Sequence, residues 1–176
     1  GSNTKVGNIV ALYPYNGDAT LNSSATALST TLSAEQSYNN ASFGVGSSIM
    51  VSAGDSRRLT LRNVCGWLRV ELTGEGESVK SITLRGNAGE QVAGLIYVDT
   101  ATAEATLASE MGEASDEEQG GGVGGGLEFD NTVFTEVTLD CGNGVELGAE
   151  ATAFYIALLP QTFEKGMTIE INYANG

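Results

Sequence analysis

Apolar and polar residues alternate along much of this chain, which is the pattern of β-strands with one buried and one exposed face. The alternation is clear over residues 59–64, 68–72 and 167–173, and residues 133–139 form a further β-branched segment. No segment repeats its apolar residues with the period of a helix. The pattern therefore predicts an all-β protein.

Turn residues between these segments predict how the strands connect. Cys65-Gly66 separates two alternating segments, so we expect two strands joined by a tight bend there. Residues 86–89 read Gly-Asn-Ala-Gly and separate the alternating segment 82–85 from the apolar segment 92–98. The second pair is expected to form a hairpin.

Two segments end at a proline, and one segment has no clear period. Residues 9–13 are predicted to form a strand that ends before Pro14. The continuous apolar run 154–159, which ends before Pro160, is typical of a central strand buried on both faces. Residues 19–34 are rich in Ser and Thr, and we expect a loop there with at most one short edge strand.

Many short strands separated by turns favour an antiparallel Greek-key β-sandwich, an immunoglobulin-like architecture. The chain has 176 residues, and we expect residues 3–176 to form a single sandwich domain, either an N-terminal domain or a truncated chain. Residues 112–126 include six glycines in the seven positions from Gly120 and several acids. They are expected to form a flexible acidic loop.

Charge and composition exclude several classes of function. The net charge is −14, which disfavours nucleic acid because binding its phosphates depends on Lys and Arg. The chain has no histidine, so histidine-based nucleophile activation and His-ligated metal sites are excluded. Residues 1–100 carry eight acids and seven bases, whereas residues 101–176 carry fourteen acids and one base. The negative charge therefore belongs to the second half of the chain.

Carboxylates are the abundant reactive groups, but they match no defined motif. Calcium accepts six to eight oxygen ligands in loose geometry, so acidic loops are weak candidates for a site. The candidates are Asp116, Glu117, Glu118, Asp140, Asn143 and Glu146. Their spacing fits no EF-hand, and solvated surface acids are the simpler interpretation. No cofactor and no metal are expected.

For the aromatic residues within or beside the predicted strands, packing in the core is expected over the alternative of a sugar-stacking platform. They are Trp67, Tyr97, Phe129, Phe134, Phe154 and Tyr155. Tyr13 and Tyr15 flank Pro14 at a strand end, so they are the better candidates for contact with a ligand or partner.

Cys65 and Cys141 leave two interpretations open. A disulfide between them would close a long loop and could add about 4 kcal/mol in the chain-entropy model. Alternatively, both are free thiols, which are commonly buried like small apolar residues.

Three parts of the chain, about half of its length, resemble the fimbrillin-like surface proteins of Gram-negative anaerobes. The middle part is the most specific, and the outer parts support it. The first part is residues 9–16 (IVALYPYN). The middle part is residues 59–74 (LTLRNVCGWLRVELTG) with residues 79–89 and 92–94. The last part is residues 153–163 (AFYIALLPQTF) with residues 166–171.

The resemblance implies a transthyretin-like sandwich in an exported lipoprotein without catalysis, displayed on the outer membrane surface or in a fimbrium of a Gram-negative bacterium. It implies other fimbrial or surface subunits as partners, joined by strand addition, in which ladder hydrogen bonds and apolar side chains provide the affinity. A host protein or glycan is a further expected partner. Membrane attachment is expected only through an N-terminal lipid anchor that this chain does not contain.

Two features depart from the polymerising subunits of that group. A trypsin-like protease cuts those subunits after an arginine in an early loop, whereas residues 6–56 here contain no Lys or Arg. This favours a fimbrial accessory, tip or stand-alone adhesin component over a stalk subunit. In addition, the predicted strand 167–173 runs into Asn175-Gly176, a favoured hairpin turn. We expect either a removed continuation or an exposed edge strand.

Two other functions remain open from the sequence. A cell-surface glycan-binding module, calcium-dependent or not, would use Tyr13, Tyr15 and the acidic loops. A carboxylate-based glycosidase needs only two acids at the right separation in space, a signal with little specificity.

Overall fold

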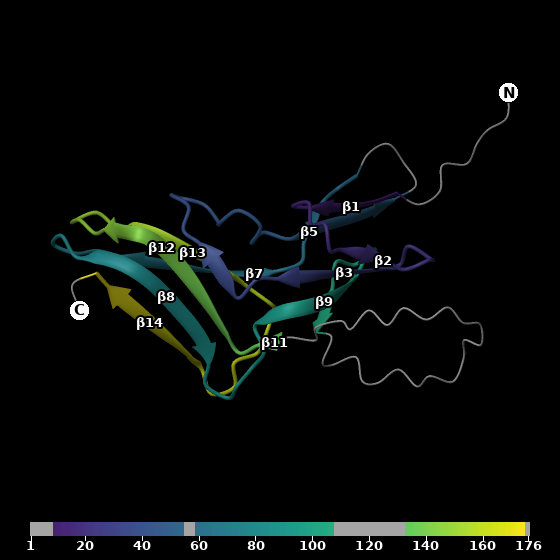
Figure 1. The fold of residues 1–176 in the computed structure, drawn as a ribbon. Coiled ribbons are helices and arrows are strands. Elements are labelled where there is room, and N and C mark those ends of the chain that lie inside the picture. The colour runs from purple at the N-terminus through teal and green to yellow at the C-terminus, as the bar shows by residue number, and fades with distance from the viewer. Residues whose placement is uncertain (1–8, 55–58, 108–132, 175–176) are drawn as a thin grey trace, which may run out of the picture.

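The computed structural model describes residues 9–54, 59–107 and 133–174, and every regular element within these ranges is a β-strand (Figure 1). Within the same ranges, no helix is long and apolar enough to cross a membrane. The expected loop 112–126 and the expected turn at Asn175-Gly176 lie outside the described residues. In chain order the strands are β1 (Ile9–Tyr13), β2 (Thr20–Leu21), β3 (Ala27–Leu32), β4 (Glu35–Ser37), β5 (Met50–Gly54), β6 (Arg62–Asn63), β7 (Gly66–Leu72), β8 (Ser78–Gly86), β9 (Ala93–Asp99), β10 (Ala105–Leu107), β11 (Val133–Phe134), β12 (Glu136–Glu146), β13 (Thr152–Leu158) and β14 (Met167–Tyr173).

Backbone hydrogen bonds join these strands into separate sheets. Their strand orders are β1-β5-β6, β10-β9-β3-β2 with β11 also on β9, β14-β8-β12-β4, and β13-β7. Figure 1 shows β14, β8 and β12 side by side at one end of the molecule. The ladders are antiparallel except that β4 runs parallel to β12. The expectation of an antiparallel fold thus holds with one exception, which the long chain segment between these two strands permits.

Short connections link the sheets into two layers. Ser33 and Ala34 alone separate β3 from β4, and Thr135 alone separates β11 from β12, so the sheets of β9 and of β8 continue into one another. Val64 and Cys65 alone separate β6 from β7, which links the sheet of β5 to that of β13. The result is a β-sandwich, as the alternating sequence predicts.

One hydrophobic core lies between these layers. Leu32 of β3, Val51 of β5, Ile82 of β8 and Ile156 of β13 are fully buried members of the same cluster. Each comes from a different sheet, so burying their side chains stabilises the whole sandwich rather than one sheet alone.

The segment 19–34 differs from its expectation, because it contains β2 and the central strand β3. β3 pairs with β2 on one side and with β9 on the other. Ser29 and Thr30 are buried, and their hydroxyls hydrogen-bond to the side chains of Thr20 and Asn16. Because these side-chain partners satisfy the hydroxyls, a strand rich in Ser and Thr can lie in the interior. Because polar residues occupy buried positions of β3, its sequence does not alternate between apolar and polar residues.

The prediction of a hairpin around residues 86–89 is wrong. β8 pairs with β12 and β14, whereas β9 pairs with β3, β10 and β11. The turn therefore carries the chain from one sheet to the next. Asn87 is fixed there by the connection before β14: its N–H donates to the Gly166 carbonyl, 3.0 Å away, and its side-chain amide to the Lys165 carbonyl, also at 3.0 Å.

The bend at Cys65-Gly66 also differs in its partners. β6 covers only Arg62–Asn63 and pairs with β5, whereas β7 pairs with β13. Val64 and Cys65 between them are buried. The two segments are thus successive strands of different sheets, because the buried bend turns the chain into a new ladder.

β13 confirms the burial expected for the run 154–159, but not its central place. Phe154, Ile156 and Ala157 are fully buried. Among the described strands, β13 pairs with β7 alone. On its other side, the side chain of Gln36 bonds to the backbone of Ala157. Burial on both faces therefore did not require a strand on both edges.

Candidate binding surface

The exposure of the aromatic residues corrects part of the core prediction. Phe154 is buried as expected, and Tyr97 and Tyr155 are half-buried. Trp67 and Phe134, however, are 46% and 37% exposed. Trp67 alternates in phase with Arg69 and Glu71, so it occupies the polar face of β7. Phe129 lies outside the described residues.

Trp67 belongs to an aromatic cluster on the outer face of the β7–β13 sheet. The ring centroid of Phe43, from the loop between β4 and β5, lies 4.7 Å from that of Trp67 and 5.1 Å from that of Tyr155. Trp67 is opposite the small residue Ala157 in the ladder. We call Phe43, Trp67 and Tyr155 the aromatic platform.

Charged groups border this platform. Arg69 lies opposite Tyr155 in the ladder, and its guanidinium carbon is 5.9 Å from the centroid of the Tyr155 ring. Its Nη2 is also 2.7 Å from the Oε1 of Glu71. Both side chains are about half exposed, so the ion pair itself adds little stability. It does place a hydrogen-bond donor and an acceptor beside the aromatic rings.

A cleft of about 320 Å³ adjoins the platform and shares Phe43 with it. Tyr13, one of the contact candidates predicted from the sequence, lines the cleft and is 54% exposed. Asn39, Ser42 and Ser48 supply polar groups to its lining. Tyr15 is 91% exposed and is not among the lining residues.

The structure brings no set of acidic residues together in the parts of the chain it describes. No group of three or more Cys, Asp or Glu side chains there could hold a metal ion. Oδ1 of Asp140 accepts a hydrogen bond from the Gly142 N–H at 2.8 Å. Asn143 and Glu146 are exposed. Asp116, Glu117 and Glu118 lie outside the described residues.

Cys65 and Cys141 are free, buried thiols in the structure. The pKa of both thiols is raised to about 11, chiefly by burial, and at Cys141 the charge of Asp140 contributes to the rise. At neutral pH both are therefore protonated and poor nucleophiles.

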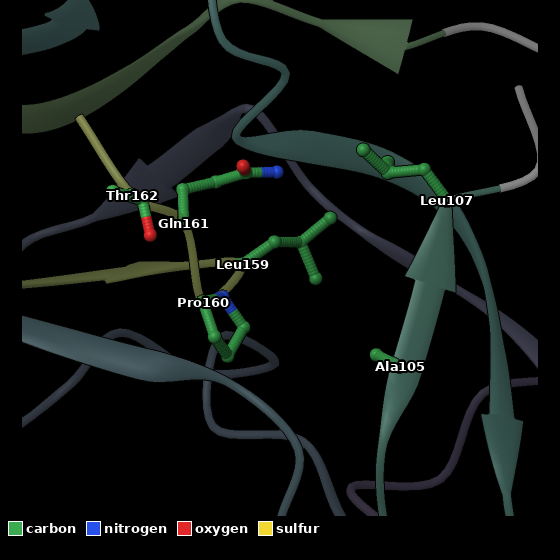
Figure 2. Close-up of a pocket in the computed structure, with 6 residues that line it drawn as sticks. All are labelled: Ala105, Leu107, Leu159, Pro160, Gln161 and Thr162. Carbon is green, nitrogen blue, oxygen red and sulfur yellow. The ribbon is translucent and has the colours of Figure 1, made fainter. Parts of the chain in front are cut away.

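A larger hollow of about 480 Å³ lies beside the end of β13 (Figure 2). Figure 2 shows Leu107, Leu159 and Gln161 around it. The Gln161 side chain donates to the Gln91 carbonyl, 2.8 Å away. The lining within the described chain includes no charged, thiol or aromatic side chain. Its described polar side chains are those of Gln161 and Thr162.

The edge strand β14 exposes apolar side chains on the face that it shares with the core. Met167, Ile169 and Tyr173 are 37%, 39% and 41% exposed. Their ladder partners in β8 include Leu84 and Val79, which are fully buried. The apolar inner face of this sheet thus becomes progressively uncovered toward β14.

The chain matches no family model, no curated protein and no solved structure. The sequence analysis identified Tyr13 but missed Phe43 and Arg69 as parts of the same surface. The phase of Trp67 within β7 was a signal for its exposure, because Leu68, Val70 and Leu72 occupy the opposite face. Phe43 carried no such signal, since it comes from a loop whose position depends on the fold.

Proposed function

We propose that this chain is a non-catalytic, structural adhesion protein of the cell surface, which joins neighbouring subunits by strand addition at β14. It acts as a fimbrial accessory, tip or stand-alone adhesin component of the fimbrillin-like kind. The observation that carries the proposal is the half-exposed apolar stripe of the edge strand β14.

β14 has the properties that strand addition requires. It is seven residues long and pairs on one side with β8, without another ladder partner among the described strands. A lysine, a proline or a charge facing the core commonly blocks pairing at a strand edge. The only charged residue of β14 is Glu170, and its carboxylate lies 3.5 Å from the Arg85 guanidinium. An added strand would therefore find open backbone groups and little repulsion.

The opposite layer offers apolar contacts of a similar kind. β7 is paired by β13 on one side alone within the described chain, and its inner residues Leu68, Val70 and Leu72 are half-buried. The inner residues of β13, Phe154 and Ile156, are fully buried. Covering the outer strands of both layers would remove more apolar area from water, at about 25 cal/mol per Å².

The sequence resemblance supports the biological setting of the proposal. It covers residues 9–16, 59–94 in large part and 153–171. On that basis we propose that the protein is exported, displayed on the outer membrane surface or in a fimbrium of a Gram-negative bacterium, and anchored by lipid. Its partners are other surface subunits.

A strand peptide tests the proposal directly. A capped peptide with the sequence of β14, MTIEINY, alternates apolar and polar residues and can pair antiparallel with β14 itself. Titrated into the 176-residue chain, it should raise the melting temperature by about 2–4 °C at saturation, because it binds the folded state. A scrambled peptide should leave the melting temperature unchanged.

Variants on the two faces of β14 locate the effect. Ile169→Lys places a charge in the apolar stripe and should abolish the response to the peptide. Thr168→Lys places the same charge on the opposite face and should retain the response to the peptide. An unchanged melting temperature with the wild-type chain, or an equal response of both variants, would reject strand addition at β14.

A further inference from the structure

We propose that the aromatic platform and the adjoining cleft bind a neutral oligosaccharide. This site uses residues on the outer face of the β7–β13 sheet, and it is separate from the apolar stripe of β14. The inference does not depend on strand addition.

The exposure of Trp67 shows that this face is incompletely covered. Burying an aromatic side chain contributes favourable free energy, and tryptophan is enriched where proteins contact ligands. Trp67 nevertheless remains 46% exposed although Phe43 stacks against it. Its neighbour across the ladder, Ala157, is fully buried and small. The exposed part of the indole is therefore available to a ligand.

The chemistry around the rings fits a sugar. One face of a pyranose carries C–H groups, which pack on the electron-rich face of an aromatic ring. Its rim carries hydroxyls, each of which donates and accepts hydrogen bonds. The Arg69–Glu71 pair provides a donor and an acceptor beside the platform, and the ion pair occupies only one of the five N–H donors of Arg69.

The charges favour a neutral sugar over an acidic one. Glu71 lies within the site, and the chain carries a net charge of −14. This negative charge would repel a sialylated or sulfated glycan, and the nearby cation, Arg69, is already paired with Glu71. A neutral glycan avoids that repulsion and can still bond to both members of the ion pair.

The cleft extends the site beyond one sugar ring. Phe43 lines the cleft and also contacts Trp67, so the two surfaces are continuous. Tyr13 also lines the cleft, Ser42 adds a hydroxyl, and Asn39 adds a side-chain amide, whose N–H already donates to the Phe43 carbonyl at 3.1 Å. A ligand that reaches from Trp67 to Tyr13 should therefore bind more tightly than one that covers the platform alone.

The experiment uses the single tryptophan of the chain as its reporter. The full chain is first applied to an array of neutral, sialylated and sulfated oligosaccharides, and each hit is then titrated in solution by tryptophan fluorescence and calorimetry. We expect neutral hits that shift the Trp67 emission to shorter wavelength, because the sugar displaces water from the indole. Longer members of a hit series should bind more tightly than monosaccharides.

Matched variants assign the site. Trp67→Ala should weaken binding in calorimetry by about tenfold or more, the loss typical of a central contact. Tyr13→Ala should weaken long ligands and leave short ones unchanged. Phe134→Ala removes an exposed aromatic residue in another sheet and should bind as the wild type does. Thermal melting confirms that each variant is folded.

Three results would overturn the proposal. The first is no binding to any oligosaccharide. The second is preferential binding of anionic glycans, or equal binding by wild type and a folded Arg69→Gln, Trp67→Ala double variant. The third is a shift of the Trp67 emission by a decaproline peptide with no glycan response, which would assign the platform to an extended peptide instead.

Discussion

The side chain of Gln36 forms with Ala157 the two hydrogen bonds that a neighbouring strand would form. Nε2 of Gln36 donates to the Ala157 carbonyl at 2.7 Å, and the Ala157 N–H donates to Oε1 of Gln36 at 2.9 Å. The backbone of Gln36 belongs to β4 and lies opposite Leu139 of β12, whereas Ala157 belongs to β13. One residue thus connects the two layers of the sandwich and completes the edge of β13.

Gln36→Met should therefore destabilise the protein strongly. Methionine has a similar volume, but it leaves the N–H and the carbonyl of Ala157 buried without partners. Each unsatisfied group costs about 1–3 kcal/mol. We expect a loss of about 2–4 kcal/mol in the free energy of unfolding, measured by urea denaturation.

Gln161→Met provides the control for this substitution. Gln161 is half-buried and makes one side-chain hydrogen bond, to the Gln91 carbonyl. It should lose about 1 kcal/mol or less. Equal losses in the two variants would mean that the two hydrogen bonds between Gln36 and Ala157 stabilise the protein no more than the single bond of Gln161.

The thiol of Cys65 should make stability depend on alkaline pH. Burial raises its pKa from about 9 to about 11, opposed in part by a hydrogen bond with the Ile49 backbone. The folded state then holds the proton more tightly than the unfolded state, so this contribution is present below pH 9 and is lost as the pH rises through 11. Wild type should lose about 2 kcal/mol more than Cys65→Ala between pH 8 and pH 10.5. Parallel pH profiles in urea denaturation would contradict this.

Gly44→Ala should displace the loop that carries Phe43. A Cβ at Gly44 would overlap the carbonyl oxygen of Ser37, which is backbone and cannot turn aside. Overpacking of this kind costs about 1–3 kcal/mol. We also expect the Trp67 emission to move to longer wavelength, because Phe43 no longer covers the indole.

Gly148→Ala is the matched control for the loop. A Cβ at Gly148 would have no atom within 4 Å, and no left-handed φ restricts this residue. Its stability and Trp67 emission should match the wild type. An unchanged emission in Gly44→Ala would show that the loop position does not depend on the space beside Ser37.

Asn87→Ala should loosen the start of β14. The side chain of Asn87 donates to the Lys165 carbonyl and accepts from the Thr168 hydroxyl at 2.6 Å. Both bonds are exposed, so we expect a loss of about 1 kcal/mol with faster amide exchange at the start of β14. Asn172→Ala removes one exposed bond to Ser81 near the other end of the strand and should have a smaller effect at its start. Equal exchange in both variants would argue against Asn87 as an anchor.

The local alternation of residues predicted several strands correctly. Ile9–Tyr13 is a strand that ends before Pro14, as expected, and Gly66–Leu72 and Met167–Tyr173 are strands because their period of two places apolar side chains on one face. The same criterion failed for β3, where buried Ser29 and Thr30 are satisfied by side chains that lie 9 and 14 residues earlier in the chain, outside β3 itself. Such partners are not visible in a window of neighbouring residues.

The candidate binding surface was less predictable than the strands. Tyr13 was identified from its place at a strand end beside Pro14, and the alternating phase of β7 already set Trp67 apart from Leu68 and Val70. The meeting of Phe43, Trp67 and Tyr155 was not predictable, because it joins a loop and two strands that are distant in sequence.

The sequence by itself determined that this protein is all-β, which face of most strands is apolar, and that its negative charge lies in its second half. These properties are local, since they depend on the order of neighbouring residues. Only the tertiary structure decided which strands pair, because strand pairing depends on long-range packing that a turn such as residues 86–89 does not specify. It likewise decided that Gln36 completes the edge of β13 and that Trp67 lies beside Phe43, since burial and exposure are properties of the packed layers.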